Sequence, residues 1–150
     1  MNSIYHRRRI VQGLLALTAM ALVPIRLFAR NVPAFEATAA DKAMEALFGG
    51  KSVSTSDQVM LKVPDIAENG AVVPVTVSTS IEGVKSISLL VVDNPNPLSA
   101  RFNLMPGVSA EISTRIKMGQ SSDVVAAVET DSGVFTSTKN VKVTIGGCGG

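Results

Sequence analysis

Apolar and polar residues alternate along most of the second half of the chain with the two-residue period of a β-strand. In the clearest case Val73, Val75 and Val77 share one face, while Thr76 and Ser78 share the other. Interrupted by turn residues, this period predicts strands over residues 59–63, 71–80, 85–92, 100–104, 110–117, 123–129 and 134–145, the last interrupted near 139–140. About seven short strands at such spacing predict an all-β fold, an immunoglobulin-like antiparallel β-sandwich.

A short helix is predicted in front of the strands, over residues 38–48. Thr38 is the expected N-cap, and Gly49 with Gly50 should end the helix, because glycine adopts the left-handed conformation found at helix ends. The polar residues 52–56 are expected to connect the helix to the first strand.

Two stretches, 89–92 and 124–128, are apolar on both faces. A strand of this kind is either central in the sheet or covered by a partner protein, and the pattern does not distinguish the two. Pro74 lacks the N–H group that a sheet ladder needs, which predicts an edge position or a bulge at that point.

Residues 1–29 are typical of an export signal. Arginines at positions 7–9 precede an apolar stretch over 14–23, which is about half the length of a membrane-spanning helix. The paired arginines indicate the twin-arginine (Tat) route and a periplasmic location.

An uncut N-terminal membrane anchor is the alternative. Three positions are open for cleavage, after Ala29, Ala34 or Ala39. With the first of these, residues 30–145 form the predicted domain.

The composition of the body excludes several functions. The only histidine and tyrosine, His6 and Tyr5, lie in the signal segment, and the chain has no tryptophan. A Ser-His-Asp or Cys-His catalytic pair is therefore impossible in the exported part, as is a closed zinc site. Residues 31–150 hold nine of the 14 basic residues against all 12 acidic ones, a net charge of −3 that does not favour nucleic-acid binding. We expect the scattered carboxylates to be solvated surface groups.

The chain ends in a segment in which only one residue carries a side chain larger than hydrogen. It reads Gly146, Gly147, Cys148, Gly149 and Gly150. Such a segment has high conformational entropy and no apolar surface to bury, which predicts a flexible arm. Its reach beyond Ile145 is on the order of 10 Å. A thiol on a slim arm can enter narrow clefts of several enzymes and form S–S bonds that are later broken, so Cys148 is the candidate site of covalent substrate attachment.

The sequence supplies this thiol with no base of its own. The nearest lysine is Lys142, and the terminal carboxylate of Gly150 disfavours a neighbouring thiolate. We therefore expect the activating groups to come from partner enzymes. An inert buried cysteine and an inter-chain disulfide are the structural alternatives for Cys148. Prenylation is disfavoured because the cysteine is third from the end.

At these residues the chain resembles the SoxY family, the carrier subunits of the Sox thiosulfate-oxidising system. The terminal Gly-Gly-Cys-Gly-Gly is the family's hallmark. Further runs resemble the family: Ile66 to Val75, Asn94 to Pro97, Arg101-Phe102 and Ile112 to Gly119. The twin-arginine leader fits as well.

This resemblance implies a substrate carrier that is not itself an enzyme and holds no cofactor or metal. It implies a heterodimer with SoxZ and transient contacts with SoxAX, SoxB and SoxCD. In such systems the haem protein SoxAX joins thiosulfate to the carrier cysteine as an S-thiosulfonate, and the manganese-dependent hydrolase SoxB releases sulfate. The molybdenum- and haem-containing SoxCD, where present, oxidises the remaining sulfane sulfur. The attachment residue carried over is Cys148.

Two other classes of function stay open at this point. One is a ubiquitin-like sulfur carrier that uses its Gly-Gly terminus as a thiocarboxylate, although such proteins are cytosolic. The other is a purely structural exported β-sandwich, which would not need Cys148.

Overall fold

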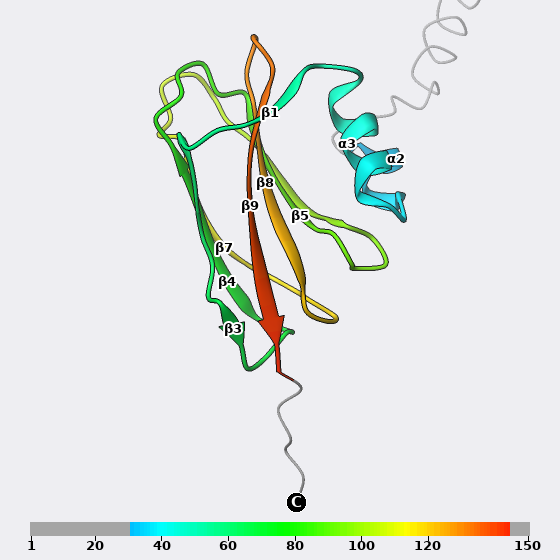
Figure 1. Ribbon diagram of the computed structural model, residues 1–150. Helices are drawn as coiled ribbons and strands as arrows, with labels where there is room; N and C mark the ends of the chain where they lie inside the picture. Colours follow the sequence, from blue (N-terminus) through cyan, green and yellow to red (C-terminus); the bar gives the residue numbers. More distant parts are fainter. Residues whose placement is uncertain (1–30, 145–150) are drawn as a thin grey trace, which may run out of the picture. The chain divides into compact units, whose positions relative to one another are not determined.

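Two layers of strands, with two short helices on one of them, make up the computed structural model over residues 31–144 (Figure 1). The elements are α2 (Val32–Glu36), α3 (Ala40–Phe48), β1 (Val53–Thr55), β2 (Val59–Lys62), β3 (Ile66–Ala67), β4 (Val73–Thr79), β5 (Ser86–Val91), β6 (Leu98–Asn103), β7 (Glu111–Ile116), β8 (Ser122–Glu129) and β9 (Val134–Val143). Residues 1–30 and 145–150 lie outside the described residues, and with them the predicted signal peptide and the Cys148 segment.

The larger sheet has the strand order β1-β9-β8-β5-β6, and β3 pairs with β9 beyond the end of β1. The smaller sheet has the order β2-β4-β7. All pairings are antiparallel except those of β1 and β3 with β9. The predicted all-β sandwich is therefore confirmed, with two short parallel pairings added to it.

Three sequence expectations about the strands were incomplete or wrong. The expected connector 52–56 contains β1, and β3 was not expected at all. The predicted interruption of the last strand near 139–140 is also wrong, because β9 runs through it. There the polar side chains find partners: Lys139 Nζ donates to the carbonyl of Val63, and Asn140 Nδ2 donates to Asp123 Oδ1.

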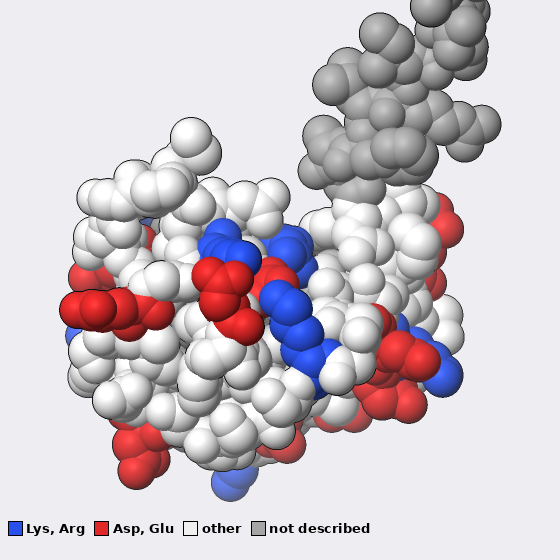
Figure 2. Space-filling model, turned by 90° about the horizontal axis from the view of Figure 1, so that it is seen from above, with Lys and Arg blue, Asp and Glu red and all other residues white. Residues whose placement is uncertain are grey.

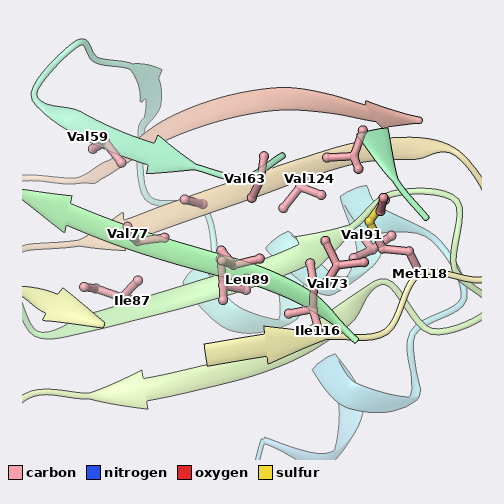
Figure 3. Close-up of a cluster of buried hydrophobic side chains, with 14 of the residues drawn as sticks. Val59, Val63, Val73, Val77, Ile87, Leu89, Val91, Ile116, Met118 and Val124 are labelled. Atoms are coloured by element: carbon pink, nitrogen blue, oxygen red, sulfur yellow. The ribbon is translucent and has the colours of Figure 1, made fainter. Parts of the chain in front are cut away.

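The two sheets enclose an aliphatic core (Figure 3). Val73, Val75 and Val77 point into it and are fully or almost fully buried, as their alternation predicted. Leu89 and Val91 of the facing β5 are buried as well. Burial of aliphatic side chains of this size contributes about 1.5–3 kcal/mol each, so this layer stabilises the sandwich substantially.

A second apolar cluster lies on the outer face of the larger sheet, where α2 and α3 cover it (Figure 1). Leu90 and Ala127 of the sheet belong to this cluster, together with Leu47 and Phe48 of α3. The stretches that are apolar on both faces are thus central strands, buried on one side by the smaller sheet and on the other by the chain's own helices.

The helices begin differently from the sequence expectation. The N-cap of α3 is Ala39, in extended conformation and without a side-chain hydrogen bond, so Thr38 is not the cap. Gly49 ends the helix as predicted, with φ of 56°. The unpredicted α2 had readable signals, because Asn31 accepts a hydrogen bond from the backbone N–H of Ala34 and a proline follows in the first turn. None of the helices in the described part is long and apolar enough to cross a bilayer.

Pro74 lies in β4, the middle strand of the smaller sheet, yet it disturbs no ladder on the β2 side. The pairing of β2 with β4 ends at Lys62 opposite Thr76, whereas Pro74 lies opposite Arg115 of β7. At this position β4 is therefore locally an edge strand, as a proline requires.

One carboxylate contradicts the expectation that the acidic residues are solvated. Glu129, at the end of β8, is 9% exposed and accepts hydrogen bonds from three side chains. Its donors are Lys51 Nζ at 2.6 Å, Arg101 Nη2 at 2.7 Å and Ser86 Oγ at 2.8 Å. The Arg101 guanidinium also lies 5.6 Å from the ring centre of Phe48 in α3.

This cluster ties the end of α3 and the following linker to strands β5, β6 and β8. It lies at the end of the sandwich opposite Thr144, since Glu129 pairs with the first residue of β9. Figure 2 looks onto this end and shows basic and acidic side chains beside one another. The cluster therefore holds the helices on the sheet and is remote from the C-terminal segment.

Burial alone would raise the pKa of the Glu129 carboxyl. The hydrogen bonds from Lys51 and Ser86, together with the positive charges of Arg101 and Lys51, outweigh burial and lower the pKa below its ordinary value. A carboxyl whose pKa is lowered by folding stabilises the native state above its unfolded pKa. That contribution is lost as the pH falls through the folded pKa.

We predict that Glu129→Gln lowers the free energy of unfolding at neutral pH by about 1–3 kcal/mol, because it removes a charged acceptor from two cations. The variant should also lose less stability on acidification than the wild type. Urea unfolding followed by circular dichroism across the acidic range measures both effects.

The matched control is Asp131→Asn, which breaks an ion pair with Lys85 that is exposed at both ends. Exposed pairs contribute little, so stability should hardly change. Equal losses of unfolding free energy in the two variants would contradict the conclusion that the Glu129 cluster holds the helices on the sheet.

Candidate functional site

The part of the candidate site that can be described is the surface around Thr144, the last described residue, which is exposed and directly follows β9. The predicted attachment residue Cys148 lies outside the described residues, as do the predicted arm glycines, Gly146, Gly147, Gly149 and Gly150. Cys148 is the fourth residue after Thr144. Covalent geometry therefore limits the distance between their Cα atoms to at most about 14 Å.

The end of β9 is held on one edge by β3. The backbone N–H of Lys142 donates to the carbonyl of Asp65 at 2.9 Å, and that of Thr144 donates to the carbonyl of Ala67 at 3.0 Å. These bonds form a short parallel ladder, with Ala67 opposite Val143. The buried Ala67 side chain keeps this ladder against the core.

The other edge of β9 is held by β8 and the loop before it. Val141 lies opposite Ser122, and the backbone N–H of Val143 donates to Ser121 Oγ at 2.9 Å. The Ser121 hydroxyl, just before β8 begins, thus extends the hydrogen bonding along this edge of β9. The backbone of β9 is consequently fixed from both sides until Thr144.

Gly70 brings the loop after β3 against the same strand end. Its carbonyl accepts a hydrogen bond from the backbone N–H of Met118 at 2.7 Å. A Cβ atom at this position would lie 2.3 Å from the Met118 carbonyl oxygen and 3.0 Å from Val143 Cγ1. Only glycine allows so close an approach.

A third loop completes this end of the sandwich. Asn94 Nδ2 donates to the carbonyl of Lys117 at 2.8 Å, and Asn94 Oδ1 accepts from the backbone N–H of Gly119 at 3.0 Å. One amide side chain therefore joins the β5–β6 loop to the β7–β8 loop. Three of the four sequence runs that carry the family resemblance, 66–75, 94–97 and 112–119, thus contribute contacts around the end of β9, whereas Arg101 of the fourth run lies in the Glu129 cluster at the opposite end.

Residues 31–144 contain neither cysteine nor histidine. Within residues 31–144 no three His, Cys, Asp or Glu side chains come together as metal ligands. A groove of about 630 Å³ lies between β2 and β9, and half of its lining residues carry hydroxyl groups, among them Thr76, Ser78 and Thr138. Its lining residues include Asp57, Lys62 and Lys139, but no cysteine or histidine that could form a nucleophile–base pair.

The geometry therefore describes a firmly anchored strand end that carries a short segment with one thiol. The comparisons with known proteins decide what kind of protein this is. The family described as "Sulfur oxidation protein SoxY" matches residues 44–148, a range that ends at the cysteine. The chain belongs to the SoxY family.

A solved structure supports this assignment of the SoxY-family chain. The sulfur carrier protein SoxY from Chlorobium limicola f thiosulfatophilum is 39% identical, with a TM-score of 0.65, and the match covers 70% of this chain and 96% of that one. A superoxide reductase (neelaredoxin) from Ignicoccus hospitalis is 17% identical, with a TM-score of 0.53 and coverage of 58% and 80%. The second likeness concerns the fold alone. No curated protein matches the chain.

We predict that Gly70→Ala lowers the free energy of unfolding by about 1–3 kcal/mol, because the new methyl group overlaps the Met118 carbonyl. Thermal or urea unfolding measures the loss. Gly119→Ala is the matched control, since its Cβ would meet only Asn94 Oδ1 at an ordinary 3.7 Å. A Gly70→Ala protein as stable as the Gly119→Ala protein would contradict the close approach.

Proposed function

We propose that this SoxY-family chain is a periplasmic carrier without catalytic activity of its own, which holds sulfur intermediates covalently on Cys148 during thiosulfate oxidation. One observation carries the proposal: the family match runs to residue 148, five residues beyond the end of β9, and that strand end is hydrogen-bonded on both edges. A fixed base and a short tether confine the sulfur to a small volume in front of the sandwich. This raises its effective concentration for any enzyme that docks there.

The loading step joins the Cys148 sulfur to the outer sulfur of thiosulfate. The S–H bond breaks, an S–S bond forms, one proton is released and two electrons leave, which gives a cysteine S-thiosulfonate. The electrons need an acceptor, and the residues that the structure describes include no metal-binding cluster to provide one. We assign this role to the haem partner SoxAX.

The unloading steps return the thiol. Water attacks the terminal sulfonate sulfur, the S–S bond to it breaks, and sulfate leaves with a proton while a persulfide stays on Cys148. Three water molecules then supply the oxygens that convert the outer sulfane sulfur to a sulfonate, seven protons are released, and six electrons pass to an acceptor on SoxCD. A second hydrolysis releases sulfate and regenerates the thiol. SoxB is the hydrolase that we assign to both hydrolyses, and SoxZ is the proposed permanent partner.

The first test is the mass of the mature protein taken from cells that oxidise thiosulfate. We predict sulfur-containing adducts that map to Cys148 and disappear with a thiol reductant. Cys148→Ser should abolish thiosulfate-dependent turnover while leaving the melting temperature and partner binding unchanged, because both core clusters of the described residues are built from side chains between Ala34 and Val143.

Sulfur found on the Gly150 carboxyl group would instead support the thiocarboxylate type of carrier. A Cys148→Ser strain that still oxidises thiosulfate normally would support a structural role and overturn the proposal.

The packing of α2 supports the first of the three candidate cleavage positions, after Ala29. Ala34 is fully buried in the outer apolar cluster, and Asn31 Nδ2 donates to the carbonyl of Ala46 at 2.8 Å. Cleavage after Ala34 or Ala39 would strip this layer from α3. We therefore predict a mature chain that begins at Arg30, which N-terminal sequencing of the exported protein checks. A chain that begins after Ala39 would show that α2 is dispensable.

A further inference from the structure

Exposed apolar side chains flank the strand end that leads to Cys148. The segment 66–72, which we call the collar, runs beside the end of β9 (Figure 1). Within it Ile66 is 57% exposed and Val72 is 50% exposed. Single exposed apolar residues are common on protein surfaces, so exposure alone assigns no role to them.

The collar is preformed rather than loose. Val72 donates its backbone N–H to the carbonyl of Asn69, and Asn69 Oδ1 accepts from the backbone N–H of Ala71. Ile66 lies in the ladder with Lys142, and Gly70 is packed against Met118. An apolar surface that is already ordered loses little entropy when a partner covers it.

The core does not require these two side chains. Their neighbours Ala67 and Val73 point inward and are buried, so the alternation places Ile66 and Val72 on the solvent side. A polar residue at either position would leave the packing of the sandwich intact. Both side chains are therefore available for contact with a partner protein.

The short length of chain between Thr144 and Cys148 indicates which kind of partner would contact this surface. The chain from Thr144 to Cys148 spans at most about 14 Å. When an enzyme encloses the Cys148 sulfur in a cleft, most of that length lies inside the cleft. Its rim must then rest on the surface next to Thr144. The collar belongs to that surface, since the carbonyl of Ala67 accepts the hydrogen bond from the backbone N–H of Thr144.

We propose that the collar is the docking surface for the enzymes that load and unload Cys148, with Ile66 and Val72 as its apolar contacts. The inference rests on the carrier function proposed above. Glu68 is the only charged residue within the collar and is exposed. The fitting partner therefore has an apolar rim around its active-site entrance and a basic group that faces Glu68, a charge pair that acts mainly on the association rate.

The chain offers matched controls at the opposite end of the sandwich. Val53 of β1 is 52% exposed and, like Ile66, lies in a short strand parallel to β9. Val108 is 57% exposed and, like Val72, lies in a loop. Aspartate at either control position changes the same kind of surface far from Thr144.

The test compares Ile66→Asp and Val72→Asp with Val53→Asp and Val108→Asp in the full mature chain, purified with its partner subunit. Thiosulfate is added together with periplasmic extract from thiosulfate-grown cells, and the rate of sulfur addition to Cys148 is followed by mass spectrometry. We expect the collar variants to load about tenfold more slowly or worse, and the controls to load like the wild type. The rate of alkylation by iodoacetamide, which needs no docking, should be the same in all five proteins.

Three outcomes decide against the proposal or separate it from the carrier function. Collar variants that load at the wild-type rate overturn the collar while the carrier function stands. Loss of the partner subunit from the collar variants identifies a permanent subunit interface and overturns the enzyme-docking role. A wild-type chain that gains no sulfur on Cys148 overturns both. If Ile66→Asp lowers the melting temperature, Ile66→Thr, which keeps the β-branched shape, takes its place.

Discussion

The parallel ladder between β3 and the end of β9 is the contact on which the functional arrangement depends. Without it, the backbone of β9 beyond Val141 would have a partner on one edge only, and a strand end held on one edge frays readily. The pairing gives the C-terminal segment a fixed origin at Thr144. It also brings the loop at Gly70 and the exposed side chains of Ile66 and Val72 next to that origin.

The sandwich separates two tasks at its two ends. At one end a nearly buried carboxylate, Glu129, collects cations and a hydroxyl and holds the helices on the outer face of the larger sheet. At the other end backbone hydrogen bonds and single polar side chains, such as Asn94 and Ser121, join three loops around the strand end. The first arrangement secures the fold, and the second leaves apolar surface available near the thiol.

The sequence predicted the features that depend on local periodicity. The alternation at Val73, Val75 and Val77 placed these residues in the core, and Gly49 ended α3 as expected. Features set by tertiary contacts escaped it. β3 has two residues, too few for a periodic signal, and is defined only by its partner β9. Ala39 caps α3 by its backbone alone, which no residue preference for side-chain caps can reveal.

The candidate site divides in the same way. A lone thiol among glycines identifies Cys148 from the sequence, because the absence of neighbouring side chains is itself the signal. The surface proposed to receive a docking enzyme could not be predicted from the sequence, since Ile66 and Val72 are ordinary apolar residues until their exposure is known. Likewise the burial of Glu129 could not be predicted from its position in the sequence. The side chains that neutralise it, Lys51, Ser86 and Arg101, come from three distant parts of the chain.

Native-state hydrogen exchange at the end of β9 tests the central claim most directly. The account predicts that the amides of Lys142 and Thr144, which donate to β3 and its flank, exchange as slowly as amides in the middle of β9. Exchange of both amides at the rate of an unstructured peptide would show that the thiol-bearing segment has no fixed origin, and would contradict the account.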